Sequence, residues 1–277
     1  EKIYIKFIPL LLFLTYVFSS DEGKVYSFKT KYEPGEIIEV KTDMLVSFEA
    51  MGTETVHGQQ QITISKFIGE KDGNLLIKEI ITDIVAIKKT LDKTSPDHDM
   101  NQIADIPYVL HIDRSGKLVE VSTEHKQYEE ELRVLKRSMN HKNYLYPFGE
   151  EAINVSKGDT WTTKPDTLNI YMGDGDMENT MIIESEYTLK KIKMKKGHEI
   201  ATISGKHKMN LSLQYLMAGK LFQGSANGTF KRKVYFDFDM GKIIIDKANA
   251  TLQYELIIDD KDISTQMVIT SEERMIK

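Results

Sequence analysis

The residues of this sequence that could do chemistry are its histidines and carboxylates, and neither type is arranged as an active site. The seven histidines are scattered along the chain. They are His57, His98, His111, His125, His141, His198 and His207. No pair has a metal-ligand spacing, and no motif of a zinc peptidase, serine hydrolase, phosphate-binding loop or dinucleotide-binding strand occurs. The sequence therefore predicts no catalytic residue, no metal and no cofactor, and we expect that the protein is not an enzyme.

Three short acidic clusters are candidate calcium loops. The segment Asp174–Glu178 has the opening of such a loop, but Asn179 replaces the required glycine and Ser185 replaces the bidentate glutamate. The other two clusters are Asp97–Asp99 and Asp259–Asp262. Solvated acidic loops are the favoured interpretation, and weak Ca²⁺ binding outside the cell stays open as the alternative.

A basic segment follows between positions 190 and 196. It carries five lysines: Lys190, Lys191, Lys193, Lys195 and Lys196. Contact with an anionic membrane surface or glycan is one interpretation. The favoured one is an exposed edge strand, because lysines on an edge prevent pairing with other chains.

The apolar residues include thirteen methionines, and they suggest a binding surface. Methionine fills irregular gaps in a core, which is its ordinary use, and also lines adaptable apolar surfaces. An apolar cavity between curled sheets would use methionine and phenylalanine in this second way. Five residues are our candidates for binding an apolar ligand there: Met44, Phe48, Leu213, Phe236 and Phe238.

The elements that must position these side chains are mainly strands. Apolar residues alternate with polar ones along most of the chain, which is the period of a half-buried strand. A strand, an aspartate, a Gly-Lys turn and a returning strand occur twice, around Gly116 and around Gly241. Gly73 and Gly197 mark two further hairpins. This repetition predicts two related halves of curved antiparallel sheet, like a barrel or half-barrel.

One helix is expected near the middle of the chain, over residues 122–140. Tyr128, Leu132, Leu135 and Met139 recur three or four residues apart, which is the helical period. The expected organisation is a signal peptide over 1–20, a first β half over 21–146 that ends in this helix, and a second β half over 147–277.

Several of these motifs together resemble a known family. They are the Asp-Gly-Asn turn at Asp72, the Gly-Lys-Leu-Val-Glu-Val strand at Gly116, the Lys-Gly-Asp-Thr-Trp segment ending at Trp161, and the Asp-Met-Gly-Lys-Ile turn at Asp239. The chain is similar to exported bacterial proteins grouped as the domain of unknown function numbered 6263. That resemblance implies export, and it implies no activity and no site residues.

Composition and the first twenty residues indicate where the protein acts. The net charge of −5 and the absence of cysteine exclude a basic nucleic-acid-binding surface, thiol chemistry and disulfides. Lys2 and Lys6 precede an apolar run that is too short for a comfortable membrane span, and Ser19-Ser20 offer a cleavage site. We expect an exported protein, periplasmic or extracellular, that is not integral to the membrane once the signal is removed. An uncleaved anchor is the alternative.

Two functional hypotheses follow from this pattern. The first is a binding or carrier module for an apolar or amphipathic ligand, such as a lipid, on the inner face of the curved sheet. The second is a structural or assembly component of the cell envelope that acts through its sheet edges or acidic loops. A tightly filled sheet interior would favour the second hypothesis over the first.

Overall fold

The computed structural model describes residues 23–50, 53–90, 93–96, 104–113, 116–128, 153–163, 166–171, 178–217, 220–258 and 261–277. Almost all of them lie in strands. The first-half strands are β1 (Val25–Phe28), β2 (Ile37–Ala50), β3 (Thr53–Lys71), β4 (Asn74–Thr90), β5 (Lys93–Pro96), β6 (Tyr108–Ile112) and β7 (Leu118–Ser122). The second-half strands are β8 (Ile153–Ser156), β9 (Thr160–Thr162), β10 (Asp166–Tyr171), β11 (Glu178–Lys195), β12 (His198–Met217), β13 (Lys220–Asp237), β14 (Lys242–Ile258) and β15 (Lys261–Met275).

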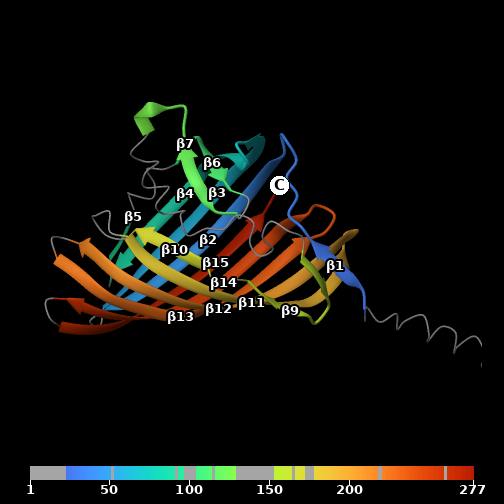
Figure 1. The fold of residues 1–277 in the computed structure, drawn as a ribbon. Coiled ribbons are helices and arrows are strands. Elements are labelled where there is room, and N and C mark those ends of the chain that lie inside the picture. Colours follow the sequence, from blue (N-terminus) through green and yellow to red (C-terminus); the bar gives the residue numbers. More distant parts are fainter. Residues whose placement is uncertain are drawn as a thin grey trace, which may run out of the picture.

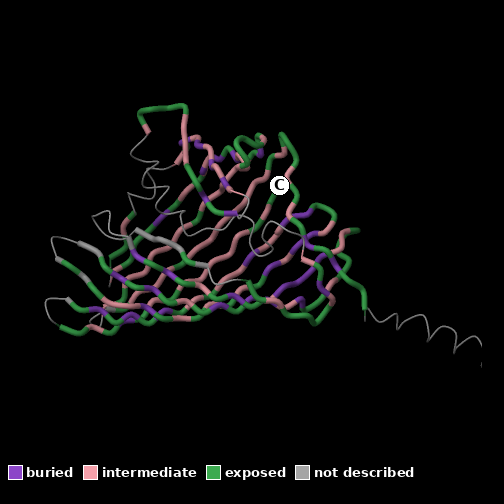
Figure 2. The backbone as a smooth tube through the Cα atoms, in the orientation of Figure 1, coloured by how far each residue is buried: buried purple, intermediate pink, exposed green. Residues whose placement is uncertain are grey.

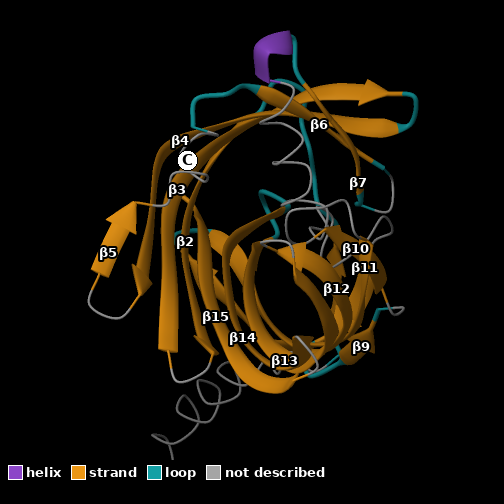
Figure 3. Ribbon diagram, turned by 90° about the vertical axis from the view of Figure 1, so that its left-hand side faces the viewer, coloured by secondary structure: helices purple, strands orange, loops and turns teal. Residues whose placement is uncertain are grey.

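Thirteen of these strands form one curled antiparallel sheet (Figures 1 and 3). Its order is β10-β11-β12-β13-β14-β15-β2-β3-β4-β6-β7, with β5 beside β4 and β9 beside β11. The last strand of the chain, β15, pairs with β2, so the two halves share one sheet. The end strands β7 and β10 do not pair with each other, so the described sheet stays open. The predicted fold class is confirmed as mainly antiparallel β, without a closed barrel.

The helix expected over 122–140 is wrong in its described part. Ser122 is the last residue of β7, and only one 3₁₀ turn follows, at Lys126–Tyr128. The Thr123 hydroxyl donates to the Pro107 carbonyl at 3.1 Å, which holds the chain in a turn where the helix was expected to begin. Residues 129–140 lie outside the described residues, and no α-helix occurs in the ranges given above.

The predicted hairpin turns are confirmed at all four glycines. Gly73, Gly116, Gly197 and Gly241 have φ angles of 81°, 87°, 87° and 66°. Each lies between two strands that pair with each other. A positive φ is easily adopted by glycine and strained for most other residues, so these four positions determine where the chain turns back.

The lysines of the basic segment lie on β11 and the turn after it. Beyond Leu189, β11 pairs with β12 on one side, and on its other side no described strand pairs with it. This part of β11 is therefore an edge. The acidic cluster at 97–99, residues 174–177 of the second cluster, part of the one at 259–262, and the expected signal peptide over 1–20 lie outside the described residues.

The buried residues, purple in Figure 2, belong mostly to three clusters of packed side chains along the sheet. The first joins β3, β4, β6 and β7 around Phe67, Tyr108 and Leu110. The second, here called the aromatic core, lies where β1 and β8 pack on β11–β13 and includes Phe28, Tyr187 and Phe236. The third, here called the apolar floor, lies toward the other end of β11–β14. It comprises Met181, Leu211, Leu213, Ala226, Leu252, Tyr254 and Leu256, flanked by Ile183, Met209, Met267 and Ile269.

Candidate functional site

The inner face of the sheet is identified by a cavity. Thr42 of β2, Gln61 of β3 and Glu273 of β15 line a cavity of about 240 Å³, together with Thr30 and Tyr32 from the segment after β1. Because alternate residues of a strand share a face, the residues that line this cavity show which side chains of their strands point to the inner face. We call this set of alternate residues the inner phase of a strand. On β15 the inner phase passes from Glu273 through Ser271 to Ile269 and Met267, which flank the apolar floor.

The cavity combines apolar walls with two buried charges. Glu79 accepts hydrogen bonds from Ser65 at 2.7 Å and from Tyr108 at 3.1 Å. The Lys242 ammonium donates to the Glu36 carboxylate at 2.7 Å and to the Lys31 carbonyl. Each charge is thus satisfied by protein groups, as burial requires. These contacts attach the segment after β1 to the sheet and form one end of the inner face.

A row of polar side chains, here called the polar belt, crosses the inner face between the aromatic core and the apolar floor. It consists of Ser185, His207, Arg232, Asp246, Glu273, Thr42 and Gln61. Thr42 lies opposite both Gln61 and Glu273 in the strand register, and Glu273 lies opposite Asp246. The Arg232 guanidinium binds the Asp246 carboxylate, its Nε lying 2.8 Å from each oxygen. The belt therefore presents fixed charges and hydrogen-bonding groups beside an apolar surface.

His207 is the most perturbed titratable group of the belt. Its side chain lies among Tyr187, Phe230 and Ser185, and the residue is only 2% exposed. Burial, which is the larger cause, and the nearby Arg232 charge together lower its pKa to about 3. Its Nδ1 and the Ser185 hydroxyl share a hydrogen bond of 2.8 Å. An imidazole with so low a pKa is a poor base at neutral pH, so this pair is not suited to activating serine as a nucleophile.

The structure divides the five predicted ligand-binding residues between two places. Leu213 belongs to the apolar floor, and Phe48 reaches it, because its ring packs edge-on against Tyr254 at 6.2 Å. Met44 lies on the same face of β2, opposite Ser271 and close to the polar belt. These three residues can therefore serve one surface.

Phe236 and Phe238 are placed elsewhere. They belong to the aromatic core, where their rings lie 5.4 and 4.7 Å from the ring of Phe28. Phe236 is 1% exposed. Their alternation along the strand was predicted correctly, but the packing of β1 over them cannot be read from the sequence. The polar belt was not predicted at all, because its members become neighbours only through the cross-strand register.

Two solved structures are similar to this chain to different degrees. A lipovitellin structure, described by the words "lipid-protein interactions in lipovitellin", matches with a TM-score of 0.52 and 10% identity, covering 89% of this chain and 26% of that one. A putative exported protein with a YmcC-like fold from Bacteroides fragilis matches with a TM-score of 0.21 and 11% identity, covering 88% of this chain and 98% of that one. The first match shows a shared fold, and this chain spans about a quarter of the lipovitellin chain. No family model and no curated protein matches the chain. No described helix has the length and apolar character needed to cross a membrane.

Proposed function

We propose that this protein binds an amphipathic, lipid-like ligand on the inner face of its sheet. The acyl part lies on the apolar floor, and the polar part lies at the polar belt. The observation that carries the proposal is the floor itself, where Ile183, Met209, Met267 and Ile269 stay partly exposed around a buried apolar centre. The chain thus acts by binding and not by catalysis, which agrees with the low basicity of His207.

The open layering over the apolar floor supports this proposal. In the described part of the chain, β1 and β8 cover the aromatic-core end of β11–β13, whereas the extensive backbone contacts of β11–β15 are with neighbouring strands of the same sheet. An apolar sheet face is stable in water only when another layer covers it. An acyl chain is a suitable cover, because each buried methylene group contributes about 0.8 kcal/mol.

The polar belt supports an amphipathic ligand over a purely apolar one. Arg232, Asp246 and Glu273 place charges of both signs across adjacent strands, with Thr42 and Gln61 beside them. Such groups would orient the head group of a ligand. The apolar floor would bind the acyl chain of that ligand and would accept acyl chains of different lengths. The fold shared with lipovitellin, a protein described for its lipid–protein interactions, adds support at the level of architecture.

Export is part of the same proposal. We infer that residues 1–20 are a signal peptide and that the protein acts in the periplasm or outside the cell, where a carrier would bring a poorly soluble ligand across an aqueous space. The second hypothesis, a structural component of the envelope, predicts no ligand on the inner face. It is the outcome to which failure of the experiment below would point.

Two substitutions on one strand test the proposal. Ile269 flanks the floor, whereas its neighbour Val268 lies on the opposite face and is 38% exposed. A fluorescent fatty acid is titrated into the full chain and into Ile269→Asn and Val268→Asn. We expect Ile269→Asn to weaken binding at least tenfold, since an amide must then be desolvated against the acyl chain. Val268→Asn should bind like the unmodified protein. Equal affinity of both variants, or no binding at all, would overturn the proposal.

A further inference from the structure

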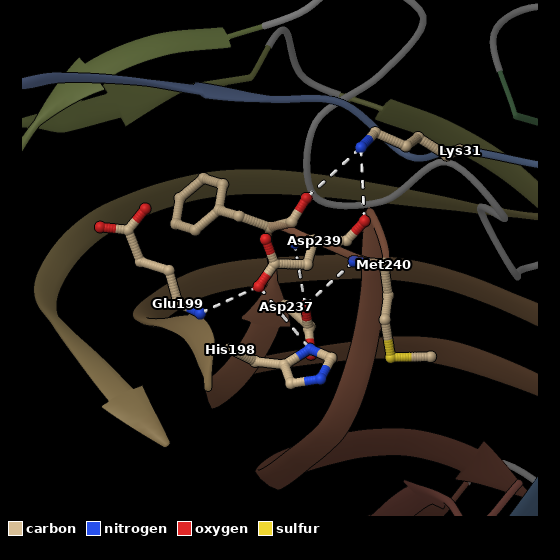
Figure 4. A network of polar contacts seen from close by, with 7 residues as sticks. Lys31, His198, Glu199, Asp237, Asp239 and Met240 are labelled. Carbon is tan, nitrogen blue, oxygen red and sulfur yellow. Dashed lines mark hydrogen bonds and ion pairs between the residues drawn. The ribbon is translucent and has the colours of Figure 1, made fainter. Parts of the chain in front are cut away.

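A second cluster of functional side chains lies at the opposite end of the second half, outside the inner face (Figure 4). His198 begins β12, Asp237 ends β13, and Asp239 lies in the turn between β13 and β14. The Nδ1 atom of His198 is 2.9 Å from Oδ2 of Asp237 and 3.7 Å from Oδ2 of Asp239. One donor atom from each of the three residues falls within 4.8 Å of the other two.

The two carboxylates are held in place by backbone amides. Asp237 has a side chain that is only 5% exposed. Its Oδ1 accepts hydrogen bonds from the amides of Asp239 and Met240 at 2.9 and 3.0 Å, which leaves Oδ2 facing His198. The amide of Glu199 donates to Oδ2 of Asp239 at 3.2 Å. Hydrogen bonds that orient a carboxylate in this way are typical of the groups around a metal ligand.

The imidazole supplies an independent observation. The Nδ1 atom of His198 is shielded from solvent and makes no hydrogen bond, although Asp237 is close by. The short distance without hydrogen-bond geometry means that the ring nitrogen does not point straight at the carboxylate oxygen. This nitrogen belongs to a side chain that is 45% exposed, and its contact with Asp237 is an ion pair without a hydrogen bond. A shared cation would satisfy the nitrogen together with both oxygens.

We propose that His198, Asp237 and Asp239 form a site for a divalent transition-metal ion, with Zn²⁺ as the best match. Zinc binds imidazole nitrogen at about 2.0–2.1 Å and carboxylate oxygen at about 2.0–2.2 Å, so neighbouring ligands of one ion lie roughly 3 Å apart. The spacings around His198 are close to this value. An imidazole nitrogen favours zinc over calcium, which prefers oxygen ligands throughout. Three protein ligands leave at least one coordination position for water.

The position of the site indicates a structural role. Phe238 stands between the two aspartates, and its ring packs on Tyr26 and Phe28 at 5.6 and 4.7 Å. The Lys31 ammonium donates to the carbonyls of Phe238 and Asp239 at 3.4 and 3.5 Å. A metal that fixed the turn to the start of β12 would therefore also secure β1 and the segment after it on the sheet.

The test uses the full chain, treated with chelator and then titrated with ZnCl₂, MnCl₂ or CaCl₂ by calorimetry. Zn²⁺ should bind with a stoichiometry of one and raise the thermal midpoint by several degrees, as mass action requires, and Ca²⁺ should bind more weakly. His198→Gln and Asp239→Asn should both lose this zinc-dependent shift. His125→Gln, an exposed histidine on another part of the fold, should keep it.

Co²⁺ gives a second readout that does not depend on stability. Bound to the unmodified protein, it should show visible absorption bands of a nitrogen- and oxygen-ligated ion, and these should be absent in His198→Gln. Asp239 is exposed, so Asp239→Asn should fold. Loss of zinc binding in this variant would therefore report on the metal site and not on misfolding. Failure of Zn²⁺ to bind, or equal binding by His198→Gln, would show that the cluster is an ion pair only. Either result would leave the lipid proposal untouched, because the inner face is separate.

Discussion

The two Asp-to-Gly turns of the molecule are held by the same kind of hydrogen bonds but differ in length. In each, an aspartate accepts amides of the turn through both its carbonyl and its carboxylate. In the first half, the Asp113 carbonyl accepts the Gly116 amide at 2.9 Å and its carboxylate accepts the Lys117 amide at 3.0 Å. In the second half, the Asp237 carbonyl accepts the Gly241 amide at 2.8 Å, and its carboxylate accepts two amides of the turn. From the aspartate to the glycine whose amide it accepts, the first turn spans 113–116 and the second spans 237–241. Measured in this way, the second turn is one residue longer.

The hairpins that precede these turns, β3–β4 and β11–β12, also differ in length, and the second is again the longer. Bulges follow Phe67 in β3 and Leu189 in β11, at matching places. Beyond the bulge, three residue pairs remain before Gly73, but five remain before Gly197. The two extra pairs carry His198 out to the longer turn, where it meets Asp237. Small extensions of one scaffold therefore bring three donor groups together in the second half and not at the first turn.

These correspondences extend to the strand order. The series β3-β4-β6-β7 in the first half matches β11-β12-β13-β14 in the second, since each neighbouring pair is hydrogen-bonded. Strands β1 and β8, which open the two halves, pair with each other. The internal repeat stays a prediction, and this shared order is the structural pattern that it requires.

We expect the two turns to differ most in how much stability is lost when the aspartate of each turn is replaced. Asp237→Ala removes a buried carboxylate that accepts two amides of its turn, and Asp113→Ala removes a half-buried carboxylate that accepts the Lys117 amide. We expect losses of about 3 kcal/mol and about 1 kcal/mol in unfolding free energy, because the first variant leaves two amide donors without their acceptor at a buried position. Urea denaturation of metal-free protein measures both. Equal losses would mean that the two turns are energetically alike.

The turn glycines give a smaller contrast. Both have a positive φ, so alanine is strained at either one. A Cβ at Gly241 would also approach the side chain of Lys31 to 2.5 Å and push it from the turn. Gly241→Ala should therefore destabilise the protein by about 2 kcal/mol and Gly116→Ala by about 1 kcal/mol. Thermal unfolding of the two variants in parallel shows which one is destabilised more. A larger effect at Gly116 would contradict the expectation that displacing Lys31 adds to the cost at Gly241.

The last prediction concerns the pH dependence of the second half. The folded-state pKa of His207 is about 3, below the ordinary value of 6.5. The unfolded chain binds the proton more tightly, so the stabilisation is fully present above pH 6.5 and is lost as the pH falls toward 3. The slope from this group is at most about 1.4 kcal/mol per pH unit. His207→Phe should flatten the unfolding free energy between pH 6 and 4, and an unchanged slope would assign the acid sensitivity to other groups.

The sequence predicted the fold through local signals. Glycines at positive φ and period-two alternation determine turns and strands within a few residues, so the hairpins at Gly73, Gly116, Gly197 and Gly241 could be found. The helix over 122–140 was wrong in its described part, because Thr123 binds a carbonyl from before β6. That contact joins residues separated along the chain, and helical periodicity does not report it.

The candidate sites depended on non-local geometry. Alternation placed Phe48, Leu213 and Phe236 on apolar faces, but only the packing of β1 decides that Phe236 is enclosed while Phe48 reaches the floor. The polar belt is assembled from seven strands, and the cluster at His198 is assembled from two chain segments. Their donor groups have no common spacing in the sequence, so a search for motifs passes over them.

Lipid binding on the inner face of the sheet is tested most directly by mapping which residues a bound lipid contacts. A fatty acid bearing a photoreactive group on its chain is bound to the full chain, illuminated, and its adducts are mapped by mass spectrometry. The account predicts adducts on the inner face, at Met209, Met267 and Ile269 around the apolar floor. Adducts on the opposite face, at the exposed Leu45, Ile87 and Val268, or a yield no greater than with an unrelated β protein, would contradict it.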